Sequence, residues 1–177
     1  MKYFSGFLSL IFFIGSAPLV YADTKVFFSP HGGCQEAVVS EIGSAHDNLD
    51  IAMYDFTLRP VAQAVLEAKA RGVKVRIVFD SAQIKEEYSK SRYLIKKGVD
   101  VRFKLGPGIM HNKFAIIDDQ VVLTGSFNWT VSAEKKNSEN LLVIKDKELA
   151  QKYEKQFKLL WGQSGEGGFK ERPEDKE

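Results

Sequence analysis

Short apolar runs alternate with helical stretches along most of this chain, and this alternation restricts the possible fold more than any other sequence feature. Apolar residues on alternate positions are typical of strands, whereas an early proline and a terminal glycine mark the two ends of a helix. Strands are predicted at about residues 25–29, 48–54, 73–79, 99–104, 113–117, 120–124 and 139–144, and helices at about 35–45, 60–70, 83–97 and 146–161. The alternation predicts an α/β fold, with a mixed, mostly parallel β-sheet between layers of α-helices.

The N-terminus has the order of a secretory signal peptide. A lysine at position 2 precedes an apolar run at 4–14, and Val20 and Ala22 supply small residues for cleavage before Asp23. An uncleaved membrane anchor is the alternative, because the apolar run lies near the short limit for a membrane span. The sequence predicts a signal peptide at 1–22, one domain at 23–162 and a flexible, charged tail at 163–177. The mature protein is then periplasmic or secreted, with no stable membrane association.

Charge and cysteine content exclude several kinds of site. The chain has 25 Lys and Arg against 23 Asp and Glu, so removing Lys2 leaves 24 against 23 and a formal charge of +1. A chain this balanced has no global field for a polyanion, so any nucleic-acid binding requires a local groove. Cys34 is the only cysteine, which excludes an intrachain disulfide and a cysteine-rich zinc site. We expect Cys34 to be a small buried residue.

His111 and Lys113 open an expected strand directly after a Gly-Pro-Gly turn, in a cluster that occurs once in the chain. Residues two apart share one face of a strand, so the imidazole and the ammonium point to one pocket. This pair is suited to attacking a phosphodiester without a metal. Asp118 has the opposite parity and lies a strand-length away. We therefore expect Asp118 to be structural, holding the adjoining turn or a neighbouring strand.

The returning strand brings a second group of polar residues to the same end of the sheet. Gly125 permits close backbone approach and Ser126 can cap the segment that follows. Asn128 carries an amide that can donate to a phosphate oxygen. Glu139 opens the next strand, and its carboxylate can accept a hydrogen bond from one imidazole nitrogen, which leaves the other free to attack.

Five further residues are candidates for binding a substrate. Lys104, Lys135 and Lys136 flank the motif in sequence and are candidates for contacts with a nucleic-acid backbone. Tyr54 and Trp129 can stack on bases, although packing in an aromatic core is an equal alternative.

The spacing of the motif resembles the signature of the phospholipase D superfamily: His111-x-Lys113-x4-Asp118-x6-Gly125-Ser126-x-Asn128. The stretches at 51–57 and 71–80 resemble the framework of that superfamily. A single-motif exported chain of this size is similar to its small nonspecific endonucleases. The resemblance implies a phospholipase D-like fold, a phosphohistidine intermediate, no metal or other cofactor, and a homodimer whose two motifs meet at the subunit interface.

The same resemblance assigns roles to individual residues. It implies that His111 is the nucleophile, that Lys113 and Asn128 bind phosphate, and that Glu139 orients the imidazole, with Ser126 counted in the catalytic set. Larger members of the superfamily carry two motifs in one chain. Because this chain has one motif, its activity is expected to depend on the association of two chains. Two identical histidines then hold different protonation states, which predicts a bell-shaped pH profile for the coupled pair.

Three functions are consistent with these residues. The first is a sequence-nonspecific endonuclease that acts on DNA, with RNA as a further candidate substrate. The second is a phospholipase D-type hydrolase or transphosphatidylase that uses the same chemistry on lipid headgroups. The third is a phosphate-binding module without turnover, which is disfavoured because every expected catalytic residue is present. The lipid function is disfavoured because the Gly106-to-Met110 segment is too short for an evident lipid-docking loop.

Overall fold

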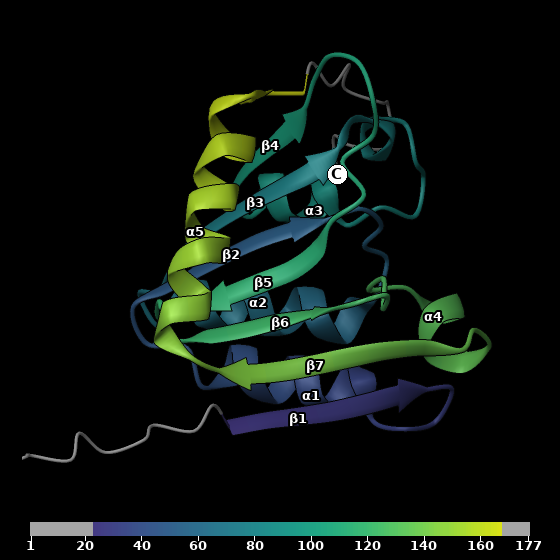
Figure 1. Cartoon of the computed structure of the whole chain (residues 1–177). Coiled ribbons are helices and arrows are strands. Elements are labelled where there is room, and N and C mark those ends of the chain that lie inside the picture. The colour runs from purple at the N-terminus through teal and green to yellow at the C-terminus, as the bar shows by residue number, and fades with distance from the viewer. Residues whose placement is uncertain (1–22, 168–177) are drawn as a thin grey trace, which may run out of the picture.

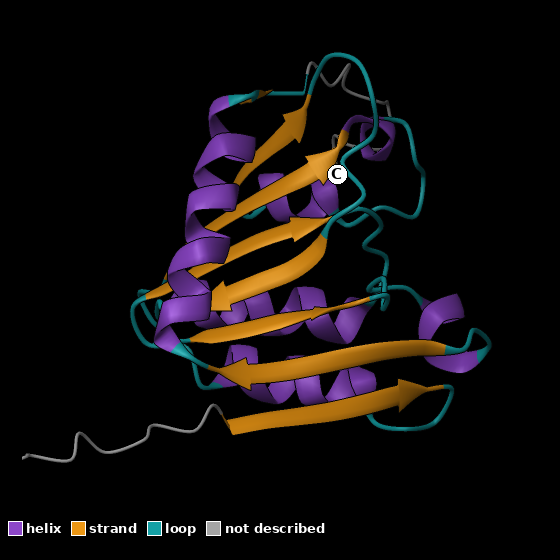
Figure 2. Ribbon diagram, viewed as in Figure 1, coloured by secondary structure: helices purple, strands orange, loops and turns teal. Residues whose placement is uncertain are grey.

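The computed structural model describes residues 23–167, so the expected signal peptide and positions 168–177 of the expected tail lie outside the described residues. Within this range one β-sheet is covered by helices on both faces (Figures 1 and 2). The strands are β1 (Asp23–Ser29), β2 (Asn48–Met53), β3 (Lys74–Asp80), β4 (Asp100–Lys104), β5 (Lys113–Ile117), β6 (Val121–Gly125), β7 (Glu139–Lys145) and β8 (Ser164–Gly165). The helices are α1 (Cys34–Gly43), α2 (Arg59–Ala70), the 3-10 helix η1 (Ser81–Ile84), α3 (Ser91–Lys96), α4 (Val131–Lys135) and α5 (Lys147–Gly162).

The strands lie in the order β1-β7-β6-β5-β2-β3-β4-β8. Among the described strands, the β2·β3 and β3·β4 pairs are parallel and the other five pairs are antiparallel. The α/β class and the mixed sheet are confirmed, but the prediction of a mostly parallel sheet is wrong. The physical reason is that strand direction depends on which strands become neighbours: β5 runs antiparallel beside β2, and β6 and β7 follow it as further antiparallel neighbours.

Two apolar layers hold the helices on the sheet. α1, α2 and α3 pack on one face, while α5 crosses the opposite face (Figure 1). The pleat of β2 explains the division, because Ile51 belongs to the first layer and Ala52 to the second. Cys34 is buried in the first layer, as predicted from its apolar surroundings.

Two predicted boundaries differ from the structure. The helix expected at 83–97 is divided into η1 and α3, because the hydroxyl of Ser89 accepts the backbone N–H of Ser91 at 3.2 Å. Such side-chain bonds compete with a continuous helix. At the C-terminal end, Ser164–Gly165 pairs with β4, so the sheet extends past the domain end predicted at Gly162.

No helix within residues 23–167 combines the length and the apolar character needed to cross a membrane. β1, β2, β3, β4 and β6 end at one edge of the sheet, where β5 and β7 begin. The connecting loops at this edge stand on the right of Figure 2. This edge, called the site edge below, carries the motif residues that open β5 and close β6.

Candidate active site

His111 and Lys113 stand at the site edge, and both contact the ring of Tyr54. The imidazole of His111 meets that ring edge-on, with centroids 4.5 Å apart and an interplanar angle of 63°. The Nζ of Lys113 lies 5.1 Å from the same ring centroid and donates a 2.9 Å hydrogen bond to the carbonyl oxygen of His111. The structure therefore brings the two predicted reactive side chains together. Tyr54, which sequence suggested as a base-stacking residue, packs against both of them.

Hydrogen bonds on both sides of His111 hold its backbone at the site edge. On one side, the N–H of Tyr54 donates to the carbonyl oxygen of Asn112 at 3.0 Å. On the other, the carboxylate of Asp80 accepts the N–H of Met110 at 2.7 Å. Asp80 is only 2% exposed. The sequence analysis missed Asp80, although an acidic residue directly after an apolar strand at this edge is a recognisable signal.

Trp129 is a core residue, so the suggestion that it stacks on substrate bases is wrong. Its side chain is 1% exposed and packs edge-on against Phe56, with ring centroids 5.0 Å apart. Its carbonyl oxygen accepts the N–H groups of Thr57 and Leu58 at 2.8 and 2.9 Å. Burial and these bonds fix Trp129 as the link between the loop after β2 and the loop after β6.

The same link connects the loop that carries Asn128 to Asp55, a neighbour of Lys113. The N–H of Trp129 donates to the carbonyl oxygen of Asp55 at 3.1 Å. Asp55 in turn lies near enough to Lys113 for its negative charge to act on the ammonium. The Oδ1 of Asn128 is buried and accepts no hydrogen bond from any residue at 23–167. Buried polar atoms are normally paired, so this amide is available to a ligand.

Close packing joins the end of β6 to the start of β7. Gly125 has φ 147°, and a Cβ there would lie 2.3 Å from the carbonyl oxygen of Asn140. The hydroxyl of Ser126 accepts the backbone N–H of Asn140 at 3.1 Å. Glu139 accepts a 3.1 Å hydrogen bond from Asn137. No hydrogen bond joins Glu139 to the imidazole in the described residues, so its predicted orienting role stays a prediction.

Partial burial shifts the pKa values of the charged groups around the reactive pair. Burial lowers the pKa of Lys113, against the opposing effects of the negative charges on Glu139 and Asp55. Burial also raises the pKa of Asp55, helped by the negative charge of Glu86. Charges in such a partly dehydrated site interact with a bound phosphate more strongly than they would in water.

The three lysines suggested for backbone contacts all belong to the site edge. Lys104 ends β4, and its Nζ donates to the carbonyl oxygen of Leu105 at 2.7 Å. Lys135 ends α4 and Lys136 follows it, and both are exposed. All three therefore lie at the same end of the sheet as the motif, and their contact with a substrate stays a prediction.

Asp118 stands at the opposite end of β5 from His111 and holds the start of β2. Its carboxylate accepts the backbone N–H groups of His46, Asp47 and Asn48 at 3.0, 2.8 and 3.0 Å. Partial burial acts to raise the pKa of Asp118, but these hydrogen bonds outweigh it and bring the pKa below its usual range. Two structural roles were expected for Asp118: holding the adjoining turn or anchoring a neighbouring strand. The structure shows the second role.

Asp118→Asn is expected to lower the free energy of unfolding by roughly 1–3 kcal/mol at pH 7, because charge-assisted hydrogen bonds are lost. A carboxyl group whose pKa is depressed in the folded state stabilises above its unfolded pKa and loses this contribution as pH falls through the folded value. The difference between the variant and the wild type should therefore shrink below about pH 4. Urea unfolding at pH 7 and at pH 3 measures both effects.

Asp119→Asn is the matched control, because Asp119 is exposed and has the same left-handed backbone, with φ 54° against 52° for Asp118. We expect this control to unfold within about 0.5 kcal/mol of the wild type. Equal stabilities of the two variants at pH 7 would refute the anchoring role of Asp118.

A pocket of about 480 Å³ opens at the site edge next to Asn128. Its lining includes Asn128 and Asp55, which connect it to the motif, together with Tyr88, Lys90 and Ser132. The sequence predicts a helix at 83–97 across Tyr88 and Lys90 and gives neither residue a role in the site. The helix expected over both residues is absent, so their positions on a loop at the site edge could not be predicted from periodicity.

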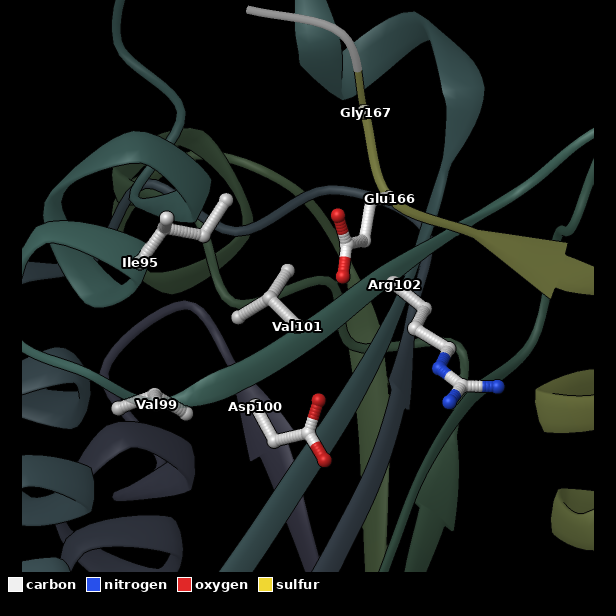
Figure 3. A pocket seen from close by; sticks show the side chains of 7 residues that line it. All are labelled: Ile95, Val99, Asp100, Val101, Arg102, Glu166 and Gly167. Atoms are coloured by element: carbon white, nitrogen blue, oxygen red, sulfur yellow. The ribbon is translucent and has the colours of Figure 1, made fainter.

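A smaller pocket of about 250 Å³ lies at the β4 end of the sheet, between α3 and the residues that follow β8 (Figure 3). Val101, Arg102 and Glu166 are among the side chains that line it (Figure 3). It contains no motif residue and is separate from the candidate active site. Within residues 23–167 no three His, Cys, Asp or Glu side chains gather as potential metal ligands.

The fold and the motif geometry together define the class of this protein. A family model described as cardiolipin synthase, PLD-like domain, matches residues 38–161. The chain belongs to the phospholipase D superfamily.

Individual relatives agree with this assignment. Phospholipase D of Rickettsia conorii is 40% identical over 126 residues, which cover 71% of this chain and 63% of that protein. Mitochondrial cardiolipin hydrolase of Xenopus tropicalis is 39% identical over 117 residues, which cover 66% of this chain and 56% of the relative. This chain therefore spans less than two thirds of the length of these two relatives. The crystal structure of Nuc from Salmonella typhimurium, a phospholipase D family member, aligns with TM-score 0.78 and 34% identity. That alignment covers 82% of this chain and 97% of Nuc.

Proposed function

We propose that this protein is an exported, periplasmic or secreted endonuclease that hydrolyses DNA, and also RNA, without sequence preference. The active site is shared between the two chains of a homodimer, and catalysis proceeds through a phosphohistidine without a metal requirement. The structural match to Nuc, with 34% identity over 97% of that chain, supports this proposal.

One observation carries the choice of substrate: the pocket beside Asn128 is polar. Hydroxyl, amide and charged side chains make up most of its lining, and Val131 is its only aliphatic member. Sites that bind the apolar part of a ligand are lined mainly by apolar side chains. Sugars, bases and phosphates of a nucleic acid instead require hydrogen-bonding groups and positive charge.

The chemistry follows from two copies of the reactive pair. A nitrogen of His111 attacks phosphorus, the P–N bond forms, and the ester P–O bond breaks as His111 of the partner subunit donates a proton to the leaving oxygen. The second imidazole, now neutral, takes a proton from water, whose oxygen attacks phosphorus and breaks the P–N bond. Lys113 from each chain neutralises charge on the phosphoryl oxygens.

One observation favours the second candidate function, hydrolysis of phospholipids. Leu105 and Ile109, on the loop that precedes His111, are 47% and 66% exposed. Exposed apolar side chains beside an active site can insert into a lipid surface. The sequence analysis considered this loop too short to be an evident docking element, and these exposures give that candidate physical support.

The deciding experiment uses purified protein that begins at Asp23, assayed in excess EDTA on single- and double-stranded DNA, on RNA, and on vesicles of phosphatidylglycerol. We expect nucleic acids to be cleaved in EDTA and vesicles to be hydrolysed at least about tenfold more slowly. Loss of DNA cleavage in EDTA would contradict the metal-free mechanism. Faster hydrolysis of the vesicles than of DNA would establish the lipid function in its place.

A further inference from the structure

The pocket beside Asn128 contains an aromatic side chain and a lysine that have no part in the motif. Tyr88 and Lys90 both lie on the loop between η1 and α3, and both line this pocket. Ser132, in the first turn of α4, also lines this pocket. The pocket is therefore built from three connections of the site edge, and its lining reaches the motif at Asn128.

Tyr88 is suited to stack on a planar ligand. Its side chain is 72% exposed, although a large aromatic side chain normally gains by burial. No ring contact to Tyr88 occurs within the part of the chain that the structure describes. Every nucleobase has a π-face, so an exposed tyrosine can bind bases of any sequence.

Lys90 is suited to bind an anion next to that ring. Its backbone N–H donates to the carbonyl oxygen of Phe56 at 2.9 Å, which fixes its position against the loop after β2. The side chain is half-buried, and its ammonium forms no ion pair with residues 23–167. A positive charge held in this way is available to a phosphate.

The acidic residue Asp55 does not abolish the preference of this pocket for an anion. Asp55 lines the pocket, and burial followed by the charge of Glu86 raises the pKa of Asp55. The ammonium of Lys113 lies near enough to act on this carboxylate, and its positive charge offsets part of the repulsion between Asp55 and an anion.

We propose that this pocket binds the nucleotide adjacent to the scissile phosphate, with Tyr88 stacked on its base and Lys90 paired with the next phosphate. The hydroxyl of Ser132 contacts the sugar or the base edge, and Asn128 marks the end of the pocket that adjoins the scissile phosphate. This inference rests on the proposed nuclease function and adds the subsite that gives affinity for a chain of nucleotides over an isolated phosphodiester.

The test compares two substrates that share the reaction but differ in nucleotides: a fluorescent single-stranded oligothymidylate and bis(4-nitrophenyl) phosphate. Tyr88→Ala should lower kcat/KM for the oligonucleotide by about 5- to 100-fold, and this loss should exceed the loss on the small diester at least fivefold. Tyr88→Phe keeps the π-face and should stay within about twofold of the wild type. Lys90→Gln should weaken oligonucleotide binding and reduce its salt dependence.

Tyr93→Ala and Lys97→Gln are matched controls, because both residues are exposed on α3 or at its end and lie outside the pocket. Equal losses for Tyr88→Ala on both substrates would overturn the subsite, as would conversion of a wild-type dimer to a monomer in sedimentation. A loss confined to phosphatidylglycerol vesicles would also overturn it, and would assign the pocket to a lipid headgroup. If the wild type hydrolyses the small diester but not the oligonucleotide, the proposed function fails first, and the subsite fails with it.

Discussion

His111→Asn is expected to lower kcat for DNA cleavage by at least about 10⁴-fold, because the variant has no nucleophile for the first step and no acid for departure of the leaving oxygen. Asparagine keeps a polar group against the ring of Tyr54, so the fold should be retained. The measurement is single-turnover cleavage in EDTA, with trapping of acid-quenched phosphoenzyme in the wild type. A variant that keeps more than a tenth of the wild-type rate would refute the nucleophile assignment.

His31→Asn is the matched control for this substitution. His31 is exposed and has φ 66°, a backbone conformation that asparagine also adopts readily. We expect its activity to remain within about twofold of the wild type.

The same variant tests whether the site is shared. When nine His111→Asn chains are refolded together with each wild-type chain, random pairing gives about 1% of dimers with two histidines. The specific activity should therefore fall to about 1% of the wild type if two histidines are needed, and to about 10% if each chain acts alone. A value near the higher figure, or a fully active monomer in sedimentation, would contradict the shared site.

Lys113→Gln is expected to lower kcat/KM by about 10²- to 10³-fold, because one positive charge per chain is lost where negative charge develops in the transition state. Burial lowers the pKa of Lys113, so the wild type should lose its ammonium as pH rises through a value below the ordinary lysine range. Its activity should consequently fall on the alkaline side at a lower pH than about 10.4. Steady-state rates between pH 5 and pH 10 measure this limb.

Lys113→Arg provides the corresponding control, since the guanidinium stays charged throughout this pH range. We expect Lys113→Arg to be more active than Lys113→Gln, and we expect its alkaline decline in activity to begin at a higher pH than in the wild type. An unchanged limb in Lys113→Arg would show that another group, such as the coupled histidine pair, causes the decline.

Local periodicity predicted most strands to within a few residues, because each strand's apolar face is encoded by residues adjacent in sequence. β5 is observed at Lys113–Ile117, the predicted range. The prediction of a helix at 83–97 was wrong because a side-chain hydroxyl interrupts it, and the periodicity of apolar residues carries no information about such hydrogen bonds. The prediction of mostly parallel strands was wrong for a different reason, because strand direction depends on which strands become neighbours across the whole chain.

The candidate site divides in the same way. The motif spacing placed His111 and Lys113 on one strand end and assigned Asp118 to the scaffold, and the geometry agrees with both placements. Spacing could not show that Trp129 is buried beneath Phe56, or that Asp80 holds the backbone beside His111. Those contacts join residues far apart in sequence.

The sequence by itself identified the superfamily, because an imidazole, an ammonium and an amide stand at spacings that one pair of strands can bring to the same end of a sheet. Only the tertiary structure decided what surrounds them. The order of the strands put the loops after β2, β3 and β6 at one edge, and so placed Asp55, Tyr88 and Lys90 around one polar pocket. The physical reason is that side-chain periodicity is local, whereas desolvation, ring contacts and pockets arise between segments that meet only when the sheet is assembled.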